Sequence, residues 1–128
     1  MPWSYTPGDD VGVLEPWPFD GEASDYVIVR GAPSASGRLD RGTSDSAHRL
    51  GIWRCTEGAF ECTERGDELQ SVLFGRVRLT RADGTMAEYG PGDSFFTQKG
   101  ERVVWDILEE VTKVFFTFDR DGIDDTSV

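Results

Sequence analysis

Four acidic side chains form the densest group in this sequence that could do chemistry: Glu61, Glu64, Asp67 and Glu68. Carboxylate oxygens are suitable ligands for Mg²⁺ or Ca²⁺, but the spacing matches no calcium-binding loop. We therefore expect most of the cluster to form a solvated rim. Glu68 has two open interpretations: a desolvated carboxyl that acts as a general acid or base, or a structural acid paired with a basic residue.

Two basic side chains could complement such an acid. Lys113 could anchor a ligand carboxylate, or act as an amine nucleophile if it is desolvated. It could equally pair with Glu109, Glu110 or Glu68. His48 is the only histidine, and we expect it at the surface. A second interpretation is that His48 acts as a base near the opening of a barrel.

The two cysteines, Cys55 and Cys62, flank an expected turn at residues 57–58. A disulfide would suit a secreted protein, and no other feature indicates secretion. We therefore expect two reduced, half-buried thiols with no nucleophilic role. If the turn closes a hairpin, Arg54 should form a cross-strand ion pair with Glu61.

Composition excludes several classes of function. The chain has 128 residues, 24 acidic and 13 basic, and a formal net charge of −11. Such a charge argues against binding to nucleic acids or anionic membranes, which rely on Lys and Arg. No apolar run approaches the length of a membrane-spanning helix, and no signal segment opens the chain, so we expect a cytoplasmic protein of one main domain.

Turn signals divide the chain into about nine short strands and leave no place for a long helix. The ADGT sequence at 82–85 and the GPGD sequence at 90–93 are strong turns, and Gly75 indicates a bulge within a strand. Residues 31–47 read as a long connection with at most one short edge strand. Strands are expected at 26–30, 50–56, 59–63, 86–89, 94–97, 101–108 and 111–118, and residues 68–80 are expected to form one long strand or two. This pattern predicts an all-β sandwich or barrel.

The ends of the chain differ from this middle region. Residues 1–24 hold four prolines, which exclude a regular helix, together with Trp3, Trp17 and Phe19. We expect this arm to pack on the barrel or on a second copy, because exposed large aromatic side chains are unfavourable. Residues 25–118 would form the barrel, and 119–128 an acidic tail. The apolar strands and the aromatic arm favour a homodimer.

Several motifs resemble those of small single-domain cupins related to the ethanolamine-utilisation Q protein and to ureidoglycine aminohydrolase. An acidic residue, a strand and a glycine at 68–75 resemble the end of the first cupin motif. The segment 90–100 resembles the second, and 53–58 and 104–109 with Lys113 resemble this branch more specifically. The resemblance implies a double-stranded β-helix, which is a small jelly-roll barrel.

The sequence departs from the family at the metal site. Metal-binding cupins present two histidines and an acid in the first motif and a third histidine in the second. Depending on the register, the histidine pair would fall on Cys62 and Glu64, on Glu61 and Thr63, or on Glu64 and Gly66, and the third histidine on Val103. None of these is histidine. Because imidazole is the usual ligand of transition metals, we expect no metal and no cofactor.

The resemblance and strand alternation together predict a pocket. If Glu68 points inward as in the family, Gln70 does too, and the same count turns Val103, Trp105 and Ile107 inward. Trp53 and Trp105 could stack a planar ligand, or could belong to the barrel core. We therefore expect a metal-poor cupin that binds a small organic molecule inside the barrel. The alternative is a lyase, isomerase or hydrolase of small metabolites that uses Glu68 as a general acid or base, with Lys113 beside it.

Overall fold

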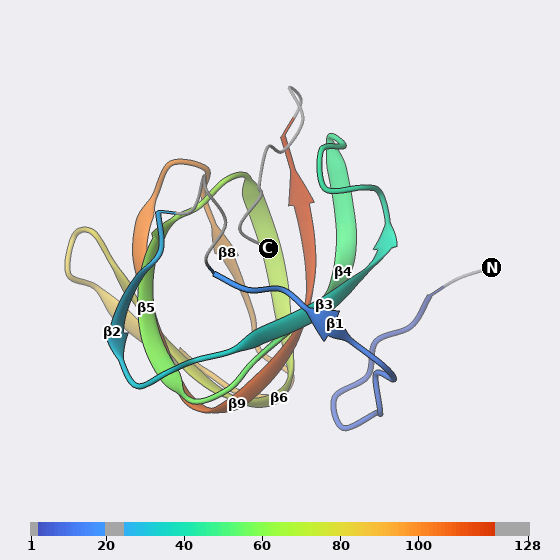
Figure 1. The fold of residues 1–128 in the computed structure, drawn as a ribbon, viewed down its shortest axis with the longest axis horizontal. Helices are drawn as coiled ribbons and strands as arrows, with labels where there is room; N and C mark the ends of the chain where they lie inside the picture. The colour runs from blue at the N-terminus through green and yellow to red at the C-terminus, as the bar shows by residue number, and fades with distance from the viewer. Residues whose placement is uncertain (1–2, 20–24, 120–128) are drawn as a thin grey trace.

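The computed structural model describes residues 3–19 and 25–119, and these contain nine strands and no helix. All strand pairs are antiparallel, and together they form one strongly curled sheet (Figure 1). The strands are β1 (Glu15–Pro16), β2 (Val27–Arg30), β3 (Ala35–Arg41), β4 (His48–Cys55), β5 (Gly58–Thr63), β6 (Asp67–Arg81), β7 (Met86–Tyr89), β8 (Ser94–Thr97) and β9 (Arg102–Phe118). The all-β barrel-like architecture predicted from the turns is confirmed.

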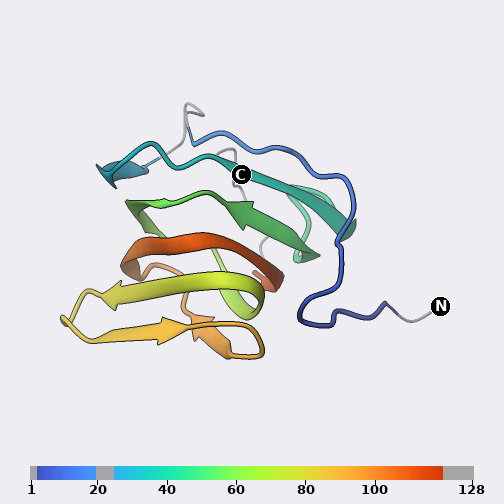
Figure 2. The same cartoon turned by 90° about the horizontal axis from the view of Figure 1, so that it is seen from below.

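Strand β9 is the centre of the sheet. It pairs with β4, β5 and β6, and the main path of the sheet runs β1-β3-β4-β9-β5-β2. Strand β6 also pairs with β7 and β8. Seen from the side, β3, β4, β9 and β6 lie in successive layers, with β7 and β8 beyond β6 (Figure 2). The long strands β6 and β9 therefore supply most of the inner wall.

A bulge in β6 makes this curvature possible. Gly75 has a φ of 80°, and the register of β6 against β9 shifts around it. A Cβ at this position would collide with the backbone of Glu110 in the neighbouring strand. Only glycine adopts this conformation without strain, so the residue that sequence analysis assigned to a bulge does bend the strand.

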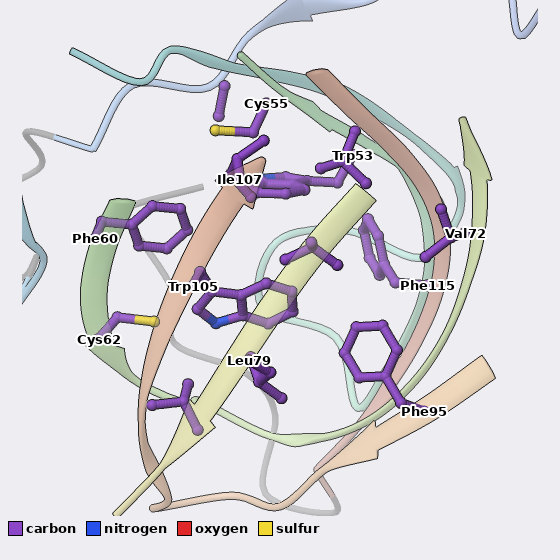
Figure 3. Packing of buried hydrophobic residues seen from close by; sticks show 14 residues of the cluster. Trp53, Cys55, Phe60, Cys62, Val72, Leu79, Phe95, Trp105, Ile107 and Phe115 are labelled. Atoms are coloured by element: carbon purple, nitrogen blue, oxygen red, sulfur yellow. The ribbon is translucent and has the colours of Figure 1, made fainter. Parts of the chain in front are cut away.

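The inner face of the curled sheet is filled mostly by aromatic and aliphatic side chains. Trp105 lies in the middle of this core, and its ring centroid is 5.9 Å from that of Trp53 and 5.7 Å from that of Phe95 (Figure 3). Phe60 stacks on Trp105 with an angle of 11° between the ring planes. Tilted and stacked rings at these separations stabilise the core beyond the burial of their area.

The N-terminal arm lies against two faces of the barrel. Val11 packs on Ile52 and Leu73 on the outer face of the sheet, in a second, smaller core. Further along, Trp17 packs edge-on against Phe115 on the inner side. Trp3 stays 48% exposed.

Three expectations about the elements were wrong. Residues 35–41 form β3, a strand of seven residues paired on both sides, where the sequence suggested at most one short edge strand. The two strands expected at 101–108 and 111–118 are one strand, β9. Arg54 does not pair with Glu61, because β9 lies between β4 and β5; Arg54 donates to Thr112, and Glu61 accepts from Arg102. Within the described part of the chain, no helix is long and apolar enough to cross a membrane.

Candidate functional site

The curled sheet forms a partly open cavity of about 60 Å³ on its inner side. At roughly 10–15 Å³ for each water-sized group, it has room for about four to six such groups. Its aromatic lining comprises Trp17, Tyr26, Trp53, Phe60, Trp105 and Phe115. Its charged lining comprises Arg49, Glu64, Arg65, Glu68 and Lys113. A small cavity with both kinds of wall is typical of sites for small molecules.

An ion pair between Lys113 and Glu68 crosses from β9 to β6 within this cavity. The Lys113 Nζ lies 3.1 Å from Oε2 of Glu68, and the side chains are 6% and 14% exposed. The other carboxylate oxygen, Oε1, accepts a hydrogen bond of 2.6 Å from the Thr117 hydroxyl. Both oxygens of Glu68 are therefore engaged by side chains of β9, which fixes the orientation of this carboxyl group.

Gln70 fixes the other side of the lysine. Its amide oxygen accepts from Lys113, and its amide nitrogen donates to the Thr97 hydroxyl at 2.9 Å. Because the two ends of the amide have different partners, its orientation is defined. Gln70 is 1% exposed and lies behind Lys113, so it positions the ammonium and does not itself line the cavity.

Two indole rings flank the same ammonium group. Lys113 Nζ lies 4.3 Å from the ring centroid of Trp105 and 4.9 Å from that of Trp53. The faces of these rings attract a cation at such distances, more strongly where water is excluded. Lys113 is therefore a buried charge held by one carboxylate, one amide and two aromatic faces.

Glu64 is the second carboxyl group of the cavity. Its Oε1 accepts a hydrogen bond of 3.0 Å from Trp105 Nε1. Burial raises the pKa of Glu64 to about 8, and the nearby charge of Glu68 adds to this rise. Lys113 and the indole hydrogen bond act in the opposite direction but do not cancel it. At neutral pH, Glu64 therefore carries a proton inside the cavity.

The expectation that the acidic cluster forms a solvated rim was wrong for Glu64. Glu61 pairs with Arg102, and a carboxylate oxygen of Asp67 accepts from the backbone of Lys99. Glu64 and Glu68 instead face the cavity. Sequence reasoning missed Glu64 because it follows the end of β5, where strand alternation no longer predicts direction. Its signals were its membership of the acidic cluster and its place at a histidine position in two of the three motif registers.

The structure brings some of the predicted site residues together and not others. Glu68, Trp53, Trp105 and Lys113 all line the cavity. Val103 and Ile107 are 1% and 0% exposed and belong to the packed core beside it.

The remaining candidates for chemistry are His48 and the two cysteines, of which Cys62 lines the cavity. His48 packs against Phe116 and Phe118 of β9. Both cysteines are free and buried; burial raises the pKa of Cys55 to about 12 and that of Cys62 well above its usual range. Neither thiol is suited to act as a nucleophile.

The cavity residues do not fit a transition-metal ion. Among residues 3–19 and 25–119, no three His, Cys, Asp or Glu side chains are grouped as a metal site would require. Glu68, the acid of the first motif, is already bound to Lys113 and Thr117. The positions that would supply imidazole hold other side chains, so the donor set lacks the nitrogen ligands that such ions need.

A family model decides the assignment of the chain. The model described as EutQ-like cupin domain matches residues 42–115, which is more than half of the sequence. The chain belongs to the EutQ-like cupin family. No curated protein matches its sequence.

Solved structures support the cupin fold. The EutQ protein of Clostridium difficile is 17% identical with a TM-score of 0.61, over 70% of this cupin and 71% of that chain. A DUF861-family protein of Thermotoga maritima is 31% identical with a TM-score of 0.51, over 52% and 76%. A DUF861-family protein of Pseudomonas syringae is 22% identical with a TM-score of 0.68, over 84% and 45%.

Proposed function

We propose that this cupin binds a small organic acid inside its barrel. The observation that carries the proposal is the set of hydrogen-bond donors in the lining. Arg49, Arg65 and Lys113 line the cavity together with Glu64, which is protonated at neutral pH. Arg65 lies 3.9 Å from Asp25 and Lys113 3.1 Å from Glu68, so ion pairs hold these two cationic groups in place. Fixed cationic donors beside a protonated carboxyl group are suited to hydrogen-bond a small carboxylate ligand.

The fixed position of Lys113 supports this choice over a cationic ligand. Its ammonium already occupies the faces of Trp53 and Trp105, which are the surfaces that an amine ligand would use. An anionic ligand could instead interact with the Lys113 ammonium and accept a hydrogen bond from the protonated Glu64. The aromatic rings would contact the short apolar part of the acid, and the volume limits it to a few heavy atoms.

The experiment compares three probes of one shape and different charge. Propionate, propionamide and propylamine are titrated into ¹⁵N-labelled protein at pH 7, and the indole Nε1–H signals of the tryptophans are followed. We expect propionate to shift the Trp53 and Trp105 signals with the lowest dissociation constant of the three. Equal or tighter binding of the amide or the amine would contradict an anion site.

Charge variants test where the anion binds. Arg49→Gln and Arg65→Gln each remove one positive charge from the lining and should weaken propionate binding several-fold. Arg78→Gln is the matched control, because Arg78 pairs with Glu88 on the exposed face of β6 and β7. If all three variants weaken binding equally, the effect comes from net charge and not from the cavity.

A second candidate function is general acid–base catalysis, favoured by the pKa of Glu64. A carboxyl with a pKa of about 8 can give or take a proton near neutral pH. Glu68 is bound to Lys113 and Thr117, so Glu64 is the better candidate for this role. The corresponding reaction is proton transfer at the carbon next to the carbonyl group of a small keto acid, an isomerase-type step.

Hydrogen exchange tests this candidate without knowledge of the product. In D₂O, the Glu64 carboxylate would remove a methyl proton of pyruvate to leave an enolate. The carboxyl group would then exchange this proton for deuterium with the solvent and return deuterium to the same carbon. Exchange is followed as loss of the methyl ¹H signal. Exchange above the buffer rate that disappears in Glu64→Gln would support catalysis, and exchange equal to buffer would exclude it for this acid.

A further inference from the structure

One arm residue forms part of the cavity wall. Trp17 lines the cavity and also an open groove of about 580 Å³ between the arm and β3. Its ring packs edge-on against Phe115, with 6.2 Å between the ring centroids. Of the groove-lining residues, Trp17 and Arg49 are the ones that also line the cavity. The Trp17 indole, together with Arg49, therefore lies between the two spaces.

The backbone holds this residue in place independently of its ring. Glu15 and Pro16 pair with β3, and the Trp17 N–H donates to the Ala35 carbonyl at 2.9 Å. Gly37 of β3 lies under the indole, and a Cβ there would collide with the ring and with the Ile52 carbonyl. The arm is thus anchored by main-chain contacts, and the side chain of Trp17 can be shortened without removing them.

We infer that the Trp17 indole sets the upper size limit of the ligand by closing the cavity toward the outer groove. The inference rests on the proposed function, because it concerns the same site. With the indole present, the cavity accepts only an acid of a few heavy atoms. Without it, the cavity would open into the groove, whose lining includes Val13, Leu14 and Leu39. The apolar chain of a longer acid would then have a surface to bind.

The test therefore compares the affinities of carboxylic acids whose apolar chains differ in length. Burial of one methylene group contributes roughly fourfold in affinity. Three additional methylenes, from propionate to hexanoate, set an upper value of roughly sixtyfold. In Trp17→Ala, we expect the affinity ratio of hexanoate to propionate to rise by about tenfold or more over the wild-type ratio.

The experiment measures propionate, butyrate and hexanoate against the wild type, Trp17→Ala, Trp17→Leu and Trp3→Ala by the same indole titration. Trp3→Ala is the matched control, because it removes an arm indole that is exposed and lies beside Arg41. Trp17→Leu keeps an apolar side chain and should show a smaller rise in the same direction, so the inference stays testable if the alanine variant does not fold.

Failure of the Trp17 inference and failure of the proposed function give different results. Wild-type binding of propionate with an unchanged chain-length ratio in both Trp17 variants would overturn the inference and leave the proposed function in place. An equal rise in Trp3→Ala would also overturn it, because the effect would then come from loosening of the arm. If no carboxylate binds to the wild type, the proposed function fails and the inference fails with it.

Discussion

Trp105 donates its indole N–H to Glu64, with 3.0 Å between Nε1 and Oε1. The acceptor oxygen of a protonated carboxyl group is its carbonyl oxygen, so the proton of Glu64 is expected on Oε2. The same indole ring presents its face to the Lys113 ammonium. One side chain thus orients the neutral acid through its edge and stabilises the cation through its face.

The raised pKa of Glu64 predicts a loss of stability as pH rises. Its ordinary pKa is 4.5, and the folded value is about 8. Between these values the unfolded chain has lost the proton and the folded chain keeps it, so the folded state binds more protons and its stability falls with increasing pH. The contribution is complete below pH 4.5 and is lost as the pH passes through about 8. Thermal unfolding from pH 5.5 to 8.5 measures it.

Glu64→Gln should flatten this profile, because glutamine has the shape of the neutral acid and does not titrate. Glu61→Gln is the control, since Glu61 pairs with Arg102 outside the cavity. Parallel profiles for the wild type and Glu64→Gln would show that Glu64 does not hold its proton in the fold.

The ion pair between Glu68 and Lys113 should be costly to break from one side. Glu68→Gln leaves a cation in a site that is 6% exposed, and we expect the free energy of unfolding to fall by about 3 kcal/mol. Adding Lys113→Met removes the uncompensated charge and should recover part of the loss. Urea unfolding gives both values. Arg78→Gln, at an exposed pair, should cost less than about 1 kcal/mol, and an equal cost at both pairs would argue against a buried charge.

Trp105→Ala should lower the free energy of unfolding by about 3–5 kcal/mol. Trp105 is 3% exposed and contacts aromatic rings on several sides, although part of its surface lines the cavity. Trp3→Ala, which removes an exposed indole, should stay within about 0.5 kcal/mol. A cost near zero for Trp105→Ala would mean that the indole borders open space and does not hold the core together.

Purified protein should contain far less than one equivalent of Zn, Fe, Ni, Cu or Mn. The reason is the absence of imidazole at the cupin ligand positions, with Glu68 engaged by Lys113. Elemental analysis of protein expressed in metal-supplemented medium is the measurement. Stoichiometric metal that disappears in Glu68→Gln would contradict the prediction.

Removal of residues 1–18 should lower the melting temperature. It deletes Val11 from the outer core, Trp17 from the cavity wall and the hydrogen bond of 2.6 Å from Tyr5 to Asp40. Sedimentation of both forms tests in parallel whether the arm contributes to the homodimer that the sequence favours. If the truncated chain melts and sediments unchanged, the arm contributes nothing to the barrel.

Strand positions followed closely from the sequence because turns are local features. The turns at 82–85 and 90–93 placed β7 and β8 at their observed ends. The length and the two-sided pairing of β3 were not predicted because its sequence, ASGRLDR, has a turn-like composition. It is a strand because β4 on one side and the arm on the other supply its hydrogen bonds, and neither partner is visible in the local sequence.

Alternation of side chains along the strands predicted part of the site. Parity placed Glu68 and Gln70 on one face of β6, and it identified Trp105 on β9. It could not place Glu64 or Trp17. Their positions depend on the curl of the sheet and the path of the arm, which arise from contacts between residues far apart in the sequence.

The order in which the strands are synthesised has a consequence for translation. Strand β9 is the common partner of β4, β5 and β6, and it is the last of the nine to leave the ribosome. Until it emerges, the preceding strands lack their shared neighbour, and their apolar inner faces have nothing to close against. Pairings between such distant segments are slow to form. The nascent chain therefore passes through a stage in which its exposed apolar faces favour aggregation, and a stop codon before residue 102 would leave strands but no barrel.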